Sequence, residues 1–206
     1  MAASGNVQVT LTISQENKRA ALDMLRRNLK LFSGVRIFDP AAPPYPDLSV
    51  FISYRREDSE DVCGRIYDRL QAAFGKESIF RDLESMPDAR DFREVLKREV
   101  ASCDLLLVIM GKSWDSSRYL RSLNNLKKDD YVRLEIETAF DHNIPVIPIW
   151  VQRRSMMPDE NHLPPSLRPL VYRTARPVRP DPDFHKDMDD VIQRIKDALN
   201  LTDPVF

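Results

Sequence analysis

Leu48-Ser-Val-Phe-Ile-Ser-Tyr-Arg-Arg56 is the stretch of sequence from which the fold of this chain can be predicted. Its centre, Val50-Phe-Ile52, is an uninterrupted run of β-branched and aromatic residues, which predicts a strand buried on both faces. Two adjacent arginines, Arg55 and Arg56, follow this strand. Ligand sites of parallel sheets form at the carboxyl ends of the strands. The arginines are therefore predicted either to bind an anion or to pair with a structural carboxylate.

From this stretch onward, the apolar pattern alternates between that of strands and that of helices. Further strands are predicted at Ser78–Phe80, Asp104–Met110 and Ile144–Trp150, with an edge strand within Leu170–Val178. Helices are predicted at Ser59–Phe74, Asp91–Ala101, Tyr131–Asp141 and Phe184–Leu199, and Arg153–Pro169 is predicted to be a long loop. Because strand–helix–strand crossovers are right-handed, this alternation predicts an α/β fold with a parallel sheet and helices on both faces.

The first 46 residues have a different pattern. Val7–Ile13 and Val35–Phe38 are predicted to be strands, and Gln15–Phe32 a helix, which gives a small N-terminal β-α-β extension. A stiff proline-rich linker, Asp39–Pro46, follows it. We therefore divide the chain into an extension over residues 1–46 and a main domain over residues 47–206. So short a piece seldom folds alone, and we expect it to pack on the main domain, on a protein partner or on a second copy.

The composition limits the classes of function. Lys and Arg number 31 and Asp and Glu 32, a formal net charge of −1, so the chain has no overall attraction for nucleic acid or for an acidic membrane. No apolar run approaches the roughly 20 residues of a membrane helix, and the N-terminus lacks signal-peptide features. Cys63 and Cys103 are predicted to be reduced core thiols. We expect a cytoplasmic protein that binds neither nucleic acid nor membranes.

Several common site motifs are missing from the sequence. There is no Gly-x-Gly-x-x-Gly run, no phosphate loop ending in Gly-Lys-Ser/Thr and no Gly-x-Ser-x-Gly elbow. The three histidines, His142, His162 and His185, are too scattered to suggest a metal site. A functional site is therefore expected to use charged side chains, with no metal.

The predicted helix Tyr131–Asp141 carries the most informative charges. Arg133 and Glu137 lie four residues apart on one flank and are predicted to pair. Tyr131 and Glu135 share the other flank, and Glu135 has no basic residue three or four positions away. Its carboxylate is either a functional acid beside an aromatic ring or a boundary glutamate paired through the tertiary structure. The buried stripe of this helix is predicted to be Val132, Ile136, Ala139 and Phe140.

Over Asp47–Leu199 the sequence resembles a bacterial-type TIR domain. The resemblance is carried by Val50-Phe-Ile-Ser-Tyr-Arg-Arg56, Phe80-Arg-Asp-Leu-Glu84, Cys103-Asp-Leu-Leu-Leu-Val-Ile109, and Asp130-Tyr-Val-Arg-Leu-Glu-Ile-Glu-Thr-Ala-Phe140 followed by Ile144-Pro-Val-Ile-Pro148. It implies a five-stranded parallel sheet of flavodoxin-like order. The segment Met86–Asp91 corresponds to the mobile "BB" loop of the family and contains no glycine.

The resemblance also implies an activity. Enzymatic TIR domains cleave NAD at the nicotinamide–ribose bond with a glutamate in a Trp-x-x-x-Glu pattern, which corresponds here to Tyr131-x-x-x-Glu135. It implies Glu135 as the catalytic residue of an NAD nucleosidase, Tyr131 as a wall of its pocket, and NAD as substrate with no cofactor. Arg55 and Arg56 are candidates to bind the pyrophosphate of NAD, or to pair with a carboxylate of the protein. The candidate carboxylate partners of the two arginines are Glu57, Asp58 and Asp82.

Two further residues are candidates for substrate binding. Asp82, after the second predicted strand, could position a loop or a ribose, and Trp114 is either a core or wall residue or a platform for adenine. The family also implies TIR–TIR self-association, and Leu134, predicted to point away from the buried stripe, is either an association contact or an incidental exposed leucine. A defence or toxin effector is the implied role. The alternatives are a non-catalytic TIR interaction module and a mimic of host TIR adaptors.

Overall fold

The computed structural model describes residues 45, 47–81, 92–115, 130–151 and 158–202. Apart from Tyr45, the predicted extension over residues 1–46 lies outside them, so the domain boundary remains a prediction. Among the described residues, no helix has the length and apolar composition needed to cross a bilayer.

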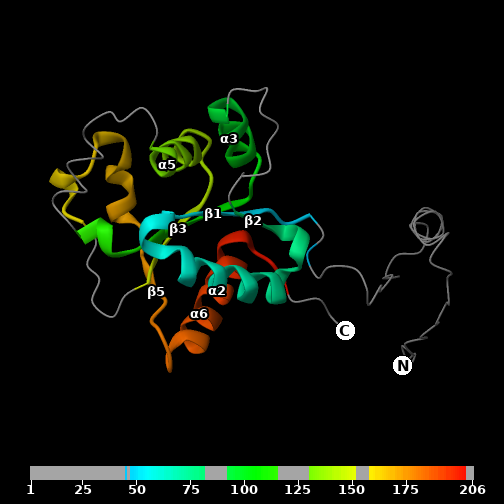
Figure 1. Ribbon diagram of the computed structural model, residues 1–206. Helices are drawn as coiled ribbons and strands as arrows, with labels where there is room; N and C mark the ends of the chain where they lie inside the picture. Colours follow the sequence, from blue (N-terminus) through cyan, green and yellow to red (C-terminus); the bar gives the residue numbers. More distant parts are fainter. Residues whose placement is uncertain (1–44, 46, 82–91, 116–129, 152–157, 203–206) are drawn as a thin grey trace, which may run out of the picture. The chain divides into compact units, whose positions relative to one another are not determined.

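The described strands form one parallel sheet (Figure 1). The strands are β1 (Val50–Ser53), β2 (Ile79–Arg81), β3 (Leu105–Met110), β4 (Val146–Trp150) and β5 (Arg176–Pro177). Their order in the sheet is β2-β1-β3-β4-β5, and each neighbouring pair is parallel. This is the flavodoxin-like order that the resemblance implies, so the predicted fold class is confirmed. The central strand β3 is buried along its whole length, as expected for a strand covered on both faces.

Helices cover both faces of the sheet (Figure 1). The helices are α2 (Arg56–Phe74), α3 (Phe92–Ala101), α5 (Tyr131–Asp141) and α6 (Phe184–Leu199). The shorter 3₁₀ helices are η2 (Lys76–Ser78), η3 (Lys112–Asp115), η4 (Glu160–His162) and η5 (Pro165–Tyr172). Helices α2 and α6 lie on one face and α3 and α5 on the other. The predicted bounds of α5 and α6 match the structure.

The predicted bounds of β1 to β4 and of α3 differ from the observed ones by one or two residues, and larger differences occur at α2 and between residues 158 and 178. Helix α2 starts at Arg56 and not at Ser59, because the Arg55 carbonyl already accepts hydrogen bonds from the backbone N–H and the Oγ of Ser59, at 3.1 and 2.9 Å. Part of the predicted loop before Pro169 belongs to η5, and the last strand has only two residues. Short 3₁₀ turns lack a distinctive apolar period, so their sequence resembles that of a loop.

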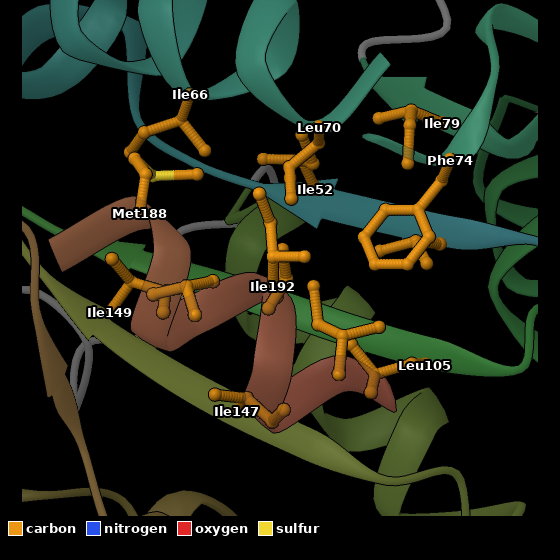
Figure 2. Packing of buried hydrophobic residues seen from close by; sticks show 14 of the residues in the cluster. Ile52, Ile66, Leu70, Phe74, Ile79, Leu105, Ile147, Ile149, Met188 and Ile192 are labelled. Atoms are coloured by element: carbon orange, nitrogen blue, oxygen red, sulfur yellow. The ribbon is translucent and has the colours of Figure 1, made fainter. Parts of the chain in front are cut away.

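The apolar core has two parts, one on each side of the sheet. Figure 2 shows the part beneath α2 and α6, where Ile66 and Leu70 of α2 and Met188 of α6 meet the sheet. The part beneath α3 and α5 contains Phe51 of β1. Because side chains alternate along a strand, Val50 and Ile52 face α2 and α6, whereas the odd-numbered residues of β1 face α3 and α5. The last residue of β1, a buried serine, thereby faces α5.

Candidate active site

A pocket of about 240 Å³ opens at the carboxyl end of β1. This is the edge of the sheet at which parallel α/β folds bind ligands. The pocket is lined by the end of β1, the start of α2, and residues of α3 and α5. Its lining residues are Ile52, Tyr54, Arg55, Arg56, Glu57, Phe92, Leu96, Tyr131, Val132 and Glu135.

Glu135 is a buried carboxylate that lines this pocket. Its side chain comes from the second turn of α5, and the residue is 9 % exposed. The Oε2 atom accepts a hydrogen bond of 2.5 Å from the Oγ of Ser53, at the end of β1. The carboxylate therefore lies where the sheet edge, α5 and the pocket meet, which is the geometry expected of a functional acid.

Tyr131 lies one helical turn before Glu135 and forms a wall of the same pocket. The residue is 39 % exposed, so its ring faces solvent in part. It packs edge-to-face on Phe92 of α3, with ring centroids 4.8 Å apart and an angle of 76° between the ring planes. This contact fixes the ring and leaves an aromatic surface at the pocket entrance.

Arg55 and Arg56 both line the pocket but have different surroundings. The Nη2 atom of Arg55 donates to Oδ1 of Asp130 at 2.6 Å, and both side chains are largely buried. Asp130 is the N-cap of α5, where Oδ1 also accepts from the backbone N–H of Arg133 at 3.2 Å. Arg55 thus pairs with a carboxylate, and its partner Asp130 is not one of the three predicted partners. Arg56, the first residue of α2, is exposed.

Comparison with known proteins identifies the family. Residues 50–188 match the sequence model of the TIR domain. The chain belongs to the TIR domain family. It is similar to the NAD(+) hydrolase tir-1 of Caenorhabditis elegans, with 28 % identity over 158 residues. The matched region is 76 % of this chain but 15 % of that protein, so the chain spans only a small part of its relative.

A solved structure supports the same fold. The TIR domains in the structure of the activated Roq1 resistosome directly recognizing the pathogen effector XopQ are similar to this chain, with a TM-score of 0.51 and 13 % identity. The similarity covers 72 % of this chain and 99 % of that one. At this identity the likeness shows the fold alone.

The other predicted residues of the TIR domain have different outcomes. Trp114 is fully buried in the core beneath α3 and α5 and is not among the residues that line the pocket, so the structure supports its interpretation as a core residue. Asp82 and the segment Met86–Asp91 lie outside the described residues. Leu134 is half-buried and packs against the same core, so the expectation of an exposed leucine is wrong.

The flank of α5 opposite the pocket has the predicted ion pair. The Nε atom of Arg133 donates to Glu137 at 2.6 Å, and the same carboxylate accepts from the Oγ of Ser166. Glu137 is therefore used in a structural contact with η5. Two glutamates of one helix, two residues apart, thus have different surroundings, and only Glu135 lines the pocket.

Among the residues of the site that were not predicted from the sequence are Ser53, Phe92 and Asp130. The alternation along β1 shows that Ser53 faces away from Ile52, and an aspartate directly before a helix is a common N-cap. The partners of these side chains, however, are 82 residues away for Ser53 and 75 for Asp130. Local sequence patterns do not reveal such pairs.

Neither a cluster of metal ligands nor an exposed thiol is found among the described residues. In the part of the chain that the structure describes, no group of three or more His, Cys, Asp and Glu side chains could hold a metal ion. Cys63 and Cys103 are buried free thiols, as predicted. Burial raises the pKa of Cys103 to about 11, so this thiol is protonated at neutral pH and is a poor nucleophile.

Proposed function

We propose that this TIR domain is an NAD nucleosidase, which hydrolyses the nicotinamide–ribose bond and releases nicotinamide with ADP-ribose or a cyclic isomer of it. The observation that carries the proposal is the buried carboxylate of Glu135 in a pocket at the carboxyl edge of the sheet. The similarity to the NAD(+) hydrolase tir-1 supports it. No cofactor is part of the proposal, because NAD itself is the substrate.

The reaction suits a site with a single well-placed carboxylate. The bond between C1′ of the ribose and the ring nitrogen breaks, and the electron pair leaves with nicotinamide, which departs as a neutral base without needing a proton. The positive charge remains on the ribose as an oxocarbenium-like centre, which a nearby carboxylate stabilises. Water then adds to C1′ and releases a proton to the solvent, which gives ADP-ribose; a cyclic isomer forms when another nucleophilic atom of the same ADP-ribosyl group attacks C1′ in place of water. We assign the stabilising role to Glu135.

The remaining lining residues would hold the rest of the substrate. Tyr131 offers an aromatic wall to the nicotinamide end, and the exposed guanidinium of Arg56 is the better placed of the two arginines to bind the pyrophosphate. Asp82 remains a candidate for a ribose contact. A volume of about 240 Å³ is below the roughly 300–1,000 Å³ of typical ligand sites. The described lining would therefore enclose one end of the dinucleotide.

The decisive experiment compares two glutamates of the same helix. Concentrated wild-type protein is incubated with NAD, and free nicotinamide is measured by chromatography. We expect Glu135→Gln to reduce nicotinamide release at least about 100-fold, as the loss of a charge-stabilising group does in other enzymes. Glu137→Gln is the matched control, since it lies two residues away and pairs with Arg133; its rate should stay within about threefold of wild type.

Circular dichroism and thermal unfolding establish that both variants are folded. Equal nicotinamide release by wild type and folded Glu135→Gln would contradict the assignment of Glu135. If wild type releases no nicotinamide at any concentration, the interaction-module alternative is favoured.

Self-association belongs to the same proposal. The family resemblance implies that a second subunit completes the pocket, and a pocket too small for the whole dinucleotide is consistent with that. The specific activity is then expected to rise with protein concentration. A defence effector that depletes NAD is the cellular role we propose.

A further inference from the structure

Ser53 is a buried polar residue at the end of an otherwise apolar strand. It is 1 % exposed, and its Oγ donates to Oε2 of Glu135 at 2.5 Å. We infer that Ser53 is a positioning residue for the reaction, which holds the Glu135 carboxylate in a fixed orientation at the pocket. This inference rests on the proposed function, because it gives Glu135 its catalytic role.

The position of Ser53 explains why a serine stands there. Val50, Phe51 and Ile52 of the same strand are apolar and buried. Alternation places Ser53 on the same face of the sheet as Phe51, beneath α5. A hydroxyl that is buried at such a site costs free energy unless it makes a hydrogen bond. The bond to Glu135 satisfies it and ties the strand to the helix that carries the carboxylate.

The hydrogen bond joins a buried hydroxyl to a buried carboxylate oxygen. Hydrogen bonds that a hydroxyl donates to an ionised carboxylate are charge-assisted and stronger than those between neutral groups. Burial favours the neutral carboxyl, whereas a donor to the charged form favours the carboxylate. A carboxylate can accept about four hydrogen bonds through its two oxygens, so the bond from Ser53 uses one of several acceptor positions. Ser53 holds Oε2 of Glu135, and Glu135 lines the pocket, so the carboxylate is held where the substrate is proposed to bind.

Among the residues that the structure describes, the other titratable groups of the pocket come from the end of β1, from the start of α2 and from α5. Arg55, Arg56 and Glu57 line the pocket from the end of β1 and the start of α2, and Tyr131 lines it from α5. Helix α3 contributes apolar lining residues. Ser53→Ala leaves these charged groups in place, so it removes only the hydrogen-bond donor to Glu135.

The test compares Ser53→Ala with Ser78→Ala. Ser78 is the matched control, since it is also 1 % exposed and its Oγ also makes a buried hydrogen bond, to the carbonyl of Tyr45 at 3.0 Å. We expect Ser53→Ala to lower kcat for nicotinamide release about 10- to 100-fold, with KM within about threefold of wild type. The acid limb of the kcat/KM profile should move to higher pH by about one unit. Ser78→Ala should lose stability without moving that limb.

A second measurement does not depend on activity. The carboxyl carbon of Glu135 is followed by NMR during a pH titration of protein labelled in its glutamate carboxyls, and the signal is assigned by its loss in Glu135→Gln. We expect the titration midpoint to be higher in Ser53→Ala than in wild type. Should Ser53→Ala fail to fold, Ser53→Cys keeps nearly the same volume with a weaker donor and should shift the midpoint in the same direction by less.

The outcomes separate this inference from the proposed function. If wild type cleaves NAD while Ser53→Ala keeps the wild-type kcat, pH profile and Glu135 midpoint, the role of Ser53 is overturned and the proposed function stands. If wild type does not cleave NAD, the proposed function fails, and the NMR titration alone tests the contact between Ser53 and Glu135. A higher titration midpoint in Ser53→Ala supports this contact, and an unchanged midpoint overturns it.

Discussion

Arg55 and Arg56 are neighbours in sequence that serve different purposes in the structure. The boundary between strand and helix falls between them, because Arg55 is the N-cap of α2 and Arg56 its first residue. The backbone therefore turns at this point and sends the two side chains to different surroundings. Arg55 pairs with Asp130 at 2.6 Å, whereas Arg56 is exposed at the pocket. Arg56 is consequently the residue that we expect to meet the substrate.

Substitution of Arg56 tests this difference. We expect Arg56→Ala to raise KM for NAD about tenfold, because a charge-assisted hydrogen bond to the pyrophosphate is lost, and to change kcat much less. Steady-state kinetics of nicotinamide release measure both constants. Arg69→Ala is the control, since Arg69 lies on the same helix and pairs with Asp189 at 2.6 Å, away from the pocket. An unchanged KM in Arg56→Ala would remove Arg56 from the substrate site.

Helix α5 carries both Tyr131 and Glu135, so its placement determines the geometry of the site. The residues at the end of β1 hold it at two points. Ser53 binds Glu135 in the second turn, and Arg55 binds Asp130 at the N-cap. Asp130 also accepts from the backbone N–H of Arg133 and so satisfies one of the free donors of the first turn. The start of the helix is thus fixed to the N-cap of α2, and the turn that carries Glu135 is fixed to the last residue of β1.

Substitutions of Asp130 separate its two contacts. Asp130→Ala removes the cap and the partner of Arg55, and we expect it to lower the free energy of unfolding by about 1–2 kcal/mol. Asp130→Asn keeps an oxygen for the cap and loses the charge, so it should cost less. Chemical denaturation measures both values, and nicotinamide release should fall in the same order. Wild-type stability of Asp130→Ala would show that neither contact contributes measurably.

Across the whole domain, the last helix is fastened to the sheet by an ion pair between Arg179 and Asp187. Arg179 follows β5, and Asp187 is a buried residue in the first turn of α6. The Nη2 atom of Arg179 donates to Oδ1 at 2.7 Å, while its Nε and backbone N donate to Oδ2 at 2.8 and 2.9 Å. Hydrogen bonds from the Arg179 side chain hold the pKa of Asp187 below its ordinary value of 3.8.

This ion pair predicts a pH dependence of stability. A carboxyl whose pKa is lowered by folding stabilises the folded state above its unfolded pKa, and this stabilisation is lost as the pH falls through the folded pKa. We expect Asp187→Asn to be less stable than wild type at neutral pH. Between about pH 5 and pH 2 its free energy of unfolding should decline less steeply than that of wild type.

Urea denaturation at a series of pH values measures this dependence. Asp189→Asn is the control, because Asp189 lies on the same helix, is largely exposed and pairs with Arg69 at the surface. Surface pairs contribute little, so its curve should follow that of wild type. Parallel curves for wild type and Asp187→Asn would show that Asp187 does not cause the acid sensitivity.

Much of the fold and part of the site followed from local patterns. The alternation of strands and helices predicted the parallel sheet, and the period of 3.6 residues placed Tyr131 and Glu135 on one flank of their helix and Arg133 and Glu137 on the other. The bounds of α5 and α6 were also predictable, since long periodic helices have the clearest sequence patterns. These features depend on backbone geometry over a few residues.

The sequence by itself therefore determined the order of the elements, the faces of the helices and the candidate acid. Only the tertiary structure decided that Glu135 receives its hydrogen bond from Ser53, that Arg55 is paired with Asp130, and that Trp114 is buried. Each of these facts depends on which elements pack together. Periodicity shows which side chains of a segment share a face. It does not show that Ser53 contacts Glu135, 82 residues away, or that Arg55 contacts Asp130, 75 residues away. Those contacts depend on the crossovers and on the packing of the whole sheet.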